Sequence, residues 1–252
     1  MSPFPEGFQA GPLPELNERY RTLPSIDIVQ LAVQWFDPHL ALASSFGPED
    51  LVLLHLLLPF KDKVEIFVLD TGRLPPETYD LIERWRIRYD LSFRFYAPDP
   101  AALEPFVTTY GPNAFYESSE RRKQCCQIRK VGPLKRALAG KKAWLTGLRR
   151  EQSTARAEID LFSLDEEGRL KISPLTPWTR AEVWAYIKTH NLPYNPLHDK
   201  GFASIGCAPC TRAIEPHEDE RAGRWWWENQ SQKECGLHSN PKSEVQYAPT
   251  SL

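Results

Sequence analysis

The chain has 252 residues, a formal net charge of −2 and an ordinary composition, with 41% hydrophobic and 25% charged residues. This length can bury the core of one α/β domain. The nearly balanced charge argues against a general nucleic-acid or membrane-surface binder. The longest apolar run, residues 51–60, is too short to cross a bilayer, and residues 1–16 lack the basic and apolar regions of a secretory signal. We therefore expect a cytoplasmic protein.

The first hundred residues predict strands and helices that alternate. Residues 1–24 are rich in Pro and polar side chains, so we expect an arm there rather than a core element. The alternation of strands and helices after this arm is typical of an α/β fold with a mostly parallel sheet covered by helices. In chain order, the elements predicted after the arm are a helix capped by Ser25, a strand over 39–44, a helix over 49–58, a strand over 64–69, a helix that begins near Pro76 with Tyr79, Ile82, Trp85 and Tyr89 on one face, and a strand over 91–96.

The second half predicts one more strand, over residues 143–148, flanked by helices over 124–139 and 179–189. Thr179 and Glu182 have the spacing of a capping box, which marks the start of the later helix. These elements continue the α/β pattern of the first half.

After Tyr194 the chain is rich in Pro, Gly and Cys and shows little periodicity. A segment of this kind is expected to fold around something other than its own side chains. The predicted organisation is an N-terminal arm over 1–24, an α/β domain over 25–214, and a C-terminal segment over 215–252.

Three loops that follow predicted strands carry groups suited to an anion. Residues 44–49 offer hydroxyls and backbone N–H groups at a helix N-terminus. Residues 69–74 add an acid, a hydroxyl and a guanidinium, and residues 146–153, with Arg156 beyond them, add two adjacent arginines. Each loop alone also fits a plain turn or solvated surface. Ligands of open parallel sheets bind at the carboxyl ends of the strands, so together the loops favour an anionic ligand.

Five cysteines form an adjacent pair, a C-x-x-C motif and a single residue. Clustered cysteines in a reducing compartment indicate a metal site or catalysis more often than disulfides. Cys125 and Cys126 are neighbours, and neighbouring side chains on a helix point about 100° apart. Two diverging thiolates suit the separate corners of a four-iron cluster better than one zinc ion. Zinc and a redox disulfide remain the alternatives for these two residues with Cys207 and Cys210.

The fifth cysteine, Cys235, stands in a Glu-Cys-Gly-Leu-His sequence near the C-terminus. A leftover thiol is often inert. Gly236 gives the chain freedom there, and an electropositive site would favour the thiolate. Arg221 and Arg224 precede it, and Lys130 follows the cysteine pair at a position between a cluster and an anionic substrate. A nucleophilic role for Cys235 is therefore one of two interpretations.

Taken together, these motifs resemble one family, the assimilatory adenylyl-sulfate reductases, which are the iron–sulfur branch of the sulfonucleotide (PAPS/APS) reductases. The resemblance runs from residue 44 to residue 238 and is specific as a combination. It is carried by Ser45-Phe46-Gly47-x-Glu49-Asp50, Leu69-Asp70-Thr71-Gly72-Arg73-Leu74, Cys125-Cys126-x-x-Arg129-Lys130, Thr146-Gly147-x-Arg149-Arg150-x-Gln152-Ser153, Ser204-Ile205-Gly206-Cys207-Ala208-Pro209-Cys210-Thr211-Arg212 and Glu234-Cys235-Gly236-Leu237-His238.

The resemblance implies a Rossmann-like fold of the adenine nucleotide α-hydrolase type and an oxidoreductase of sulfate assimilation and cysteine biosynthesis. It implies one [4Fe–4S] cluster per subunit held by Cys125, Cys126, Cys207 and Cys210. Cys235 would attack adenosine 5′-phosphosulfate (APS), release AMP and become S-sulfonated. Thioredoxin or glutaredoxin would then release sulfite. The family also implies a homo-oligomer. The substrate contacts implied are Ser44, Ser45, Gly47, Glu49, Leu69, Gly72, Lys130, Arg149, Arg221 and Arg224.

Three rival functions remain open at this point. The nearest is reduction of the 3′-phosphorylated nucleotide, PAPS, alone or with APS. An ATP pyrophosphatase of the same fold usually has Ser-Gly-Gly-x-Asp-Ser in its phosphate loop, from which residues 45–49 depart. A zinc-stabilised binding module would leave Cys235 without a role.

Overall fold

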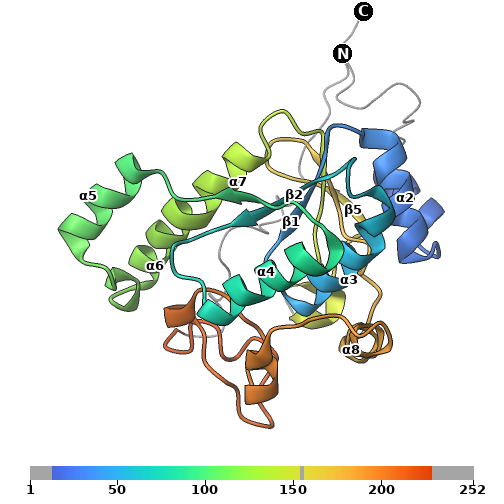
Figure 1. Ribbon diagram of the computed structural model, residues 1–252. Helices are drawn as coiled ribbons and strands as arrows, with labels where there is room; N and C mark the ends of the chain where they lie inside the picture. The colour runs from blue at the N-terminus through green and yellow to red at the C-terminus, as the bar shows by residue number, and fades with distance from the viewer. Residues whose placement is uncertain (1–12, 154–155, 229–252) are drawn as a thin grey trace, which may run out of the picture.

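The computed structural model describes residues 13–153 and 156–228. Within this part of the chain, a six-stranded sheet has the order β3-β2-β1-β4-β6-β5 (Figure 1). All neighbouring strands pair in parallel except β5 and β6, which are antiparallel. The strands are β1 (Leu40–Ser44), β2 (Glu65–Leu69), β3 (Arg94–Tyr96), β4 (Ala143–Leu145), β5 (Phe162–Leu164) and β6 (Leu170–Ile172). The predicted α/β fold is confirmed.

Helices cover the sheet and connect its parallel strands (Figure 1). None of those in the described part is long and apolar enough to cross a membrane. The α-helices are α1 (Leu13–Tyr20), α2 (Ser25–Phe36), α3 (Pro48–Leu57), α4 (Pro76–Tyr89), α5 (Pro100–Tyr110), α6 (Ser119–Cys126), α7 (Gly132–Ala137) and α8 (Arg180–Thr189). A π-helical turn, η3 (Gln127–Val131), lies between α6 and α7. The short 3-10 turns are η1 (Leu58–Phe60), η2 (Ala114–Tyr116), η4 (Arg150–Gln152), η6 (Pro196–Lys200) and η7 (Ala208–Cys210).

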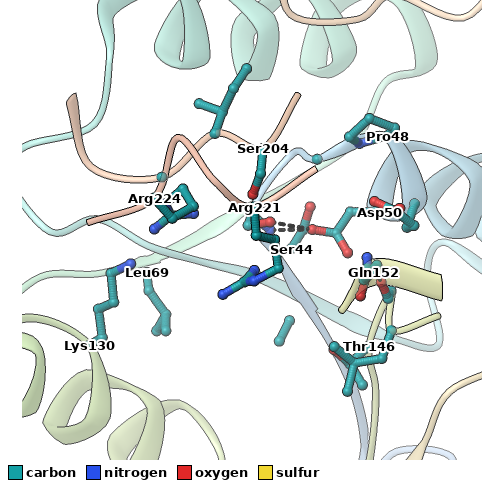
Figure 2. A pocket seen from close by; sticks show the side chains of 18 of the residues that line it. Ser44, Pro48, Asp50, Leu69, Lys130, Thr146, Gln152, Ser204, Arg221 and Arg224 are labelled. Atoms are coloured by element: carbon teal, nitrogen blue, oxygen red, sulfur yellow. Dashed lines mark hydrogen bonds between the residues drawn. The ribbon is translucent and has the colours of Figure 1, made fainter. Parts of the chain in front are cut away.

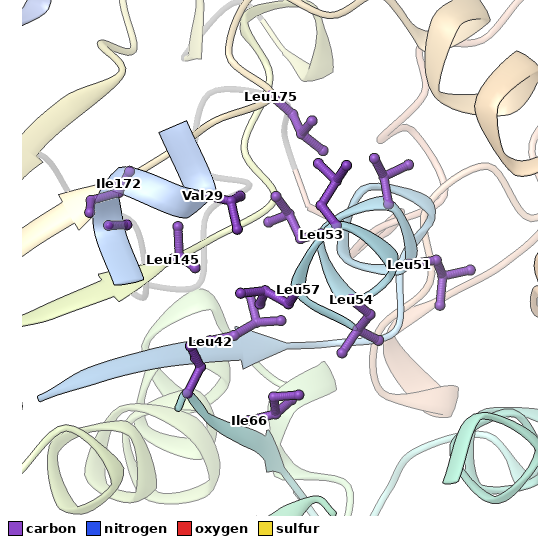
Figure 3. Packing of buried hydrophobic residues seen from close by; sticks show 14 of the residues in the cluster. Val29, Leu42, Leu51, Leu53, Leu54, Leu57, Ile66, Leu145, Ile172 and Leu175 are labelled. Atoms are coloured by element: carbon purple, nitrogen blue, oxygen red, sulfur yellow. The ribbon is translucent and has the colours of Figure 1, made fainter. Parts of the chain in front are cut away.

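The core packs around α3, which is buried on nearly every side (Figure 3). Leu51, Leu53, Leu54 and Leu57 are each at most 1% exposed. A helix that is apolar all round belongs inside a protein, and each fully buried Leu contributes about 2 kcal/mol. Burial of α3 therefore fixes its N-terminus, Pro48, at the edge of the sheet.

Strand β1 shows why this sheet needs helices on both faces. Leu40 and Leu42 belong to the large core around α3, whereas Ala41, between them, packs with Phe67 and Trp144 on the other side. Side chains of a strand alternate between faces, so a strand that is apolar throughout must be covered twice.

Several predicted elements differ from the observed ones. Residues 13–20 form α1 instead of an arm, and Leu16 is buried in the core because α1 packs on β5. Ser25 does not cap α2: the N-cap is Pro24, and the Ser25 hydroxyl donates to Pro174 O and accepts from the Trp178 indole.

Two further differences concern helices. The single helix predicted over residues 124–139 is interrupted by the π-turn η3 directly after Cys126. Tyr79, predicted on the buried face of α4, is 37% exposed because its hydroxyl donates to Asp70 Oδ1 at 2.7 Å. The capping box of α8 is confirmed, with Thr179 Oγ1 accepting from Glu182 N.

Candidate active site

A cavity of about 200 Å³ lies where β1, β2 and β4 end (Figure 2). The carboxyl ends of these parallel strands meet at one edge, as expected for a ligand site of an open sheet. Predicted substrate contacts found in its lining are Ser44, Ser45, Gly47, Glu49, Leu69, Lys130, Arg221 and Arg224.

The loop from β1 to α3 forms one side of this substrate cavity. Gly47 is the N-cap of α3, and Pro48 starts the helix, so backbone N–H groups and the positive end of the helix dipole lie at the cavity. Asp50 Oδ2 accepts hydrogen bonds from Ser45 N at 2.6 Å and Ser45 Oγ at 2.7 Å, which fixes the loop. Burial raises the pKa of Asp50 to about 6, although these two hydrogen bonds oppose the shift.

Four cations from three separate stretches of chain reach the cavity. Lys130 comes from η3, Arg156 from the β4–β5 connection, and Arg221 and Arg224 from the segment after η7. Figure 2 shows Lys130 and Arg224 on one side, Asp50 and Gln152 on the opposite side, and Arg221 between them. This arrangement suits an anionic ligand with a polar, uncharged part.

Arg149 and Gly72 do not line the cavity in the described structure. The Arg149 side chain is 1% exposed, and it donates to Glu49 Oε1 at 2.6 Å and to Glu220 Oε2 at 3.2 Å. It therefore orients two acidic groups of the wall instead of facing the ligand. Gly72 has a φ of 68° and donates its N–H to Asp70 Oδ1, so its place is in the turn after β2.

A second cavity is lined by all four cysteines of the predicted cluster site. Cys125 and Cys126 end α6, Cys207 directly precedes η7, and Cys210 is the last residue of η7. All four thiols are free, and all but Cys125 are buried. Cations surround this cysteine cavity: Arg73, Arg122, Arg129, Lys130 and Arg224.

The thiols of the cysteine cavity differ in their tendency to ionise. Burial raises the pKa of Cys210 to about 12, and Cys207 adds to this shift. Burial acts in the same direction on Cys207, but the cations Lys130, Arg224 and Arg129 and a hydrogen bond with the Thr71 hydroxyl together outweigh burial and lower the pKa of this thiol.

The donor set suits a thiolate-ligated metal group, whose negative charge the cations would balance. Within the described residues, no three His, Cys, Asp or Glu side chains come as close together as a single metal ion requires. The evidence that this cavity suits a thiolate-ligated metal group is therefore the four thiols that line it and the cations beside them.

The two cavities share a wall made of Lys130, Arg224 and Trp225, which line both. Trp225 is 1% exposed, and the guanidinium carbons of Arg122 and Arg224 lie 4.7 and 4.8 Å from its ring. The Trp225 N–H donates to Cys210 O at 3.2 Å. The same three side chains therefore face both cavities.

Sequence reasoning missed some of these groups. Thr71 was noted only as part of a loop, yet its hydroxyl contacts Cys207 Sγ at 3.3 Å. Trp225, which the motifs did not single out, is part of the shared wall. Glu220 lines the cavity without any local signal in the sequence. The predicted nucleophile, Cys235, lies outside the described residues.

Comparisons with known proteins agree with this arrangement. Residues 39–213 match the phosphoadenosine phosphosulfate reductase domain family. An adenosine 5′-phosphosulfate reductase of Allochromatium vinosum is 54% identical over 197 residues, which cover 78% of this chain and 77% of the relative. One of Pseudomonas aeruginosa (strain LESB58) is 44% identical over 245 residues, which cover 94% of this chain and 90% of the relative.

Among solved structures, the phosphoadenylyl-sulfate reductase of Candida auris in a phosphate complex superposes with a TM-score of 0.69 and 29% identity, covering 80% of this chain and 96% of that one. An FMN adenylyltransferase mutant of Candida glabrata, at 15% identity and a TM-score of 0.51, shares the fold, covering 87% of this chain and 81% of its own. Because the family match spans most of the sheet and both cysteine motifs, the chain belongs to the phosphoadenosine phosphosulfate reductase family.

Proposed function

We propose that this chain reduces adenosine 5′-phosphosulfate to sulfite and AMP in sulfate assimilation. The relatives that carry this enzyme name support the substrate. The observation that carries the proposal is the wall of Lys130, Arg224 and Trp225 between the two cavities. It puts cations between a site suited to an anionic nucleotide and a site suited to a thiolate-ligated group.

The first chemical step is attack of the Cys235 thiolate on the sulfate sulfur. A bond forms between Cys235 Sγ and that sulfur, the sulfur–oxygen bond to the phosphate breaks, and AMP leaves with the electron pair. Lys130, Arg221 and Arg224 line the cavity, where they would balance the charge that develops on the leaving phosphate. The role of Cys235 itself rests on the sequence.

The second step needs a dithiol reductant, for which we propose thioredoxin or glutaredoxin. One thiolate attacks Sγ of the sulfonated Cys235 and releases sulfite, and the second thiol resolves the mixed disulfide and restores Cys235. The dithiol is oxidised by two electrons while sulfate sulfur becomes sulfite sulfur. A thiol reductant of this kind operates in a reducing compartment, in line with the proposed cytoplasmic location. The homo-oligomer stays a prediction.

Cys125, Cys126, Cys207 and Cys210 would hold one [4Fe–4S] cluster, because all four line one cavity. Such a cluster supplies negative charge when bound, beside Lys130 and Arg224. These two residues face both cavities. A ligand bound in either cavity would therefore help to orient the two side chains toward the ligand in the other cavity.

The test uses APS labelled with ³⁵S and the anaerobically purified protein without reductant. The parent protein should retain one label per chain and release it as sulfite when thioredoxin is added. Cys235→Ser should retain none and make no sulfite. Sulfite formation by Cys235→Ser at the parental rate would contradict the mechanism.

Parallel measurements separate the rival functions. Iron and sulfide in near four-to-four ratio, with a brown colour, support the cluster over zinc. Competition between APS and PAPS assigns the substrate, and ATP consumption would indicate a pyrophosphatase.

A further inference from the structure

Residues 220–228, here called the bridging segment, run from the substrate cavity to the cysteine cavity. Glu220 and Arg221 line the first cavity, and Arg224 and Trp225 line both. The described structure gives this segment no helix or strand, apart from a single antiparallel bridge between Thr211 and Arg224. A few backbone hydrogen bonds to residues 210–212 and the side-chain contacts at its two ends therefore hold it in place.

A buried ion pair holds the first end of the bridging segment. Arg149 Nη2 donates to both oxygens of Glu220, at 3.3 and 3.2 Å, while Arg149 Nε donates to Glu49 Oε1 at 2.6 Å. The Arg149 side chain is 1% exposed and that of Glu220 is 19% exposed. The Arg149 guanidinium thus links Glu220, the residue before Arg221, to Glu49 in the first turn of α3.

A second buried ion pair holds the other end. Arg122 donates to Glu228 through Nε at 2.9 Å and through Nη2 at 2.8 Å, and the two side chains are 1% and 5% exposed. Arg122 belongs to α6, the helix that ends with Cys125 and Cys126. The bridging segment is therefore fixed to the helix that carries half of the cluster cysteines.

These pairs are poor candidates for a role in stability alone. Removing two charges from water offsets most of the attraction between them, so apolar side chains of similar size would stabilise the fold as well. The bidentate pair between Arg122 and Glu228 does fix direction and distance, and Arg149 restrains Glu220 through one nitrogen that contacts both carboxylate oxygens. Between the pairs, the Gly223 carbonyl accepts from Arg212 N, and Trp225 N donates to Cys210 O.

We propose that Glu220 and Glu228 are positioning residues that fasten the bridging segment at both ends, so that Arg221 and Arg224 stay at the substrate cavity and the chain toward Cys235 starts beside the cluster cysteines. The second half of this statement rests on the proposed function of Cys235. Cys235 is seven residues beyond Glu228. Seven extended residues span at most about 25 Å, so a fixed Glu228 limits where the thiol can go.

The experiment compares Glu220→Gln and Glu228→Gln with a matched control, Glu218→Gln, in the holoenzyme. Glu218 pairs with Arg212 just before the bridging segment, but these side chains are 31% and 34% exposed. Amide hydrogen exchange of the peptide covering 220–228 should be at least about 10-fold faster in both test variants, because each loses one buried charged partner. Glu218→Gln should exchange like the parent.

Two functional measurements accompany hydrogen exchange. Glu220→Gln should weaken AMP binding about 10-fold through Arg221, whereas Glu228→Gln should slow the single-turnover sulfonation of Cys235 about 10-fold with AMP affinity changed less than about 3-fold. Both should keep the visible absorption of the parent, which excludes loss of the metal group as the cause. Arg122→Lys keeps the charge but cannot make the bidentate pair, so it should behave like Glu228→Gln.

The proposal would be overturned if Glu220→Gln and Glu228→Gln both showed the same amide hydrogen exchange and the same AMP affinity as Glu218→Gln. A parent protein that never sulfonates Cys235 would overturn the proposed reaction instead. The exchange and AMP measurements would still decide whether the bridging segment is held by its two ends.

Discussion

The two cavities share a wall but are built in different ways. The substrate cavity is lined by residues at the ends of β1, β2 and β4, where pairing of the strands fixes the backbone. The cysteine cavity is lined by the end of α6, the turn η7 and the bridging segment, with little regular structure between them. Strand pairing can shape the first cavity without a ligand, whereas the second depends on side-chain contacts and on what the thiols bind.

The first prediction, with the largest expected effect, tests whether the cysteine cavity depends on a group bound by its thiols. In the proposed cluster site, Cys210→Ser replaces a ligand sulfur with a hydroxyl that binds iron poorly, so the protein should lose most of its iron and at least about 100-fold of its sulfite formation. Far-ultraviolet circular dichroism should change little, because the sheet is packed around α3, away from this cavity. Iron content, turnover and the dichroism spectrum are the measurements.

Pro209→Ala is the matched control, since it changes one of the two residues between Cys207 and Cys210 and keeps all four thiols. It should retain iron and activity. If Cys210→Ser also retained both, the cysteine cavity would not depend on a bound group and the contrast between the cavities would fail.

The same contrast explains what the sequence predicted well. Strands such as 64–69 have buried apolar runs followed by polar loops, and strand ends meet at one edge, which is why Ser44 and Leu69 line the same cavity. The periodic pattern of α8 with its capping box was equally clear.

The remaining features depend on contacts between distant residues. Arg149 follows β4 as predicted, but only the positions of Glu49 and Glu220 decide that its side chain lies behind the cavity wall. Arg122 and Glu228 are separated by 106 residues, and neither shows a local pattern. The three-residue strands β5 and β6 are too short for periodicity to reveal, and their pairing depends on tertiary contacts.

The second prediction concerns a charge that belongs to the substrate cavity alone. Burial raises the pKa of Asp50 from 3.8 to about 6, so the folded protein binds a proton that the unfolded chain has released between these pH values. Stability therefore falls as the pH rises from about 4 to about 6, by about 2 to 3 kcal/mol, and then levels off. Asp50→Asn should lack this fall.

Thermal unfolding of the two proteins between pH 4 and 8 checks this prediction. The difference in melting temperature should grow in favour of Asp50→Asn up to about pH 6 and stay constant above it. Asp80→Asn, at an exposed carboxyl on α4, should follow the parent curve. Parallel curves for Asp50→Asn and the parent would show that the Asp50 carboxyl ionises in the folded protein as it does in the unfolded chain.

The third prediction, with the smallest expected effect, concerns the shared wall. It tests whether a change at this wall affects both cavities or only one. A Cβ at Gly206 would overlap the guanidinium of Arg224, which is 6% exposed and has little room to move. Gly206→Ala should therefore displace Arg224, weaken AMP binding about 10-fold and alter the visible absorption of the metal group, because Arg224 lines both cavities. Gly132→Ala, whose Cβ would make only an ordinary contact at 3.5 Å, is the control. An effect on AMP binding with an unchanged spectrum would mean that the wall separates the two sites without coupling them.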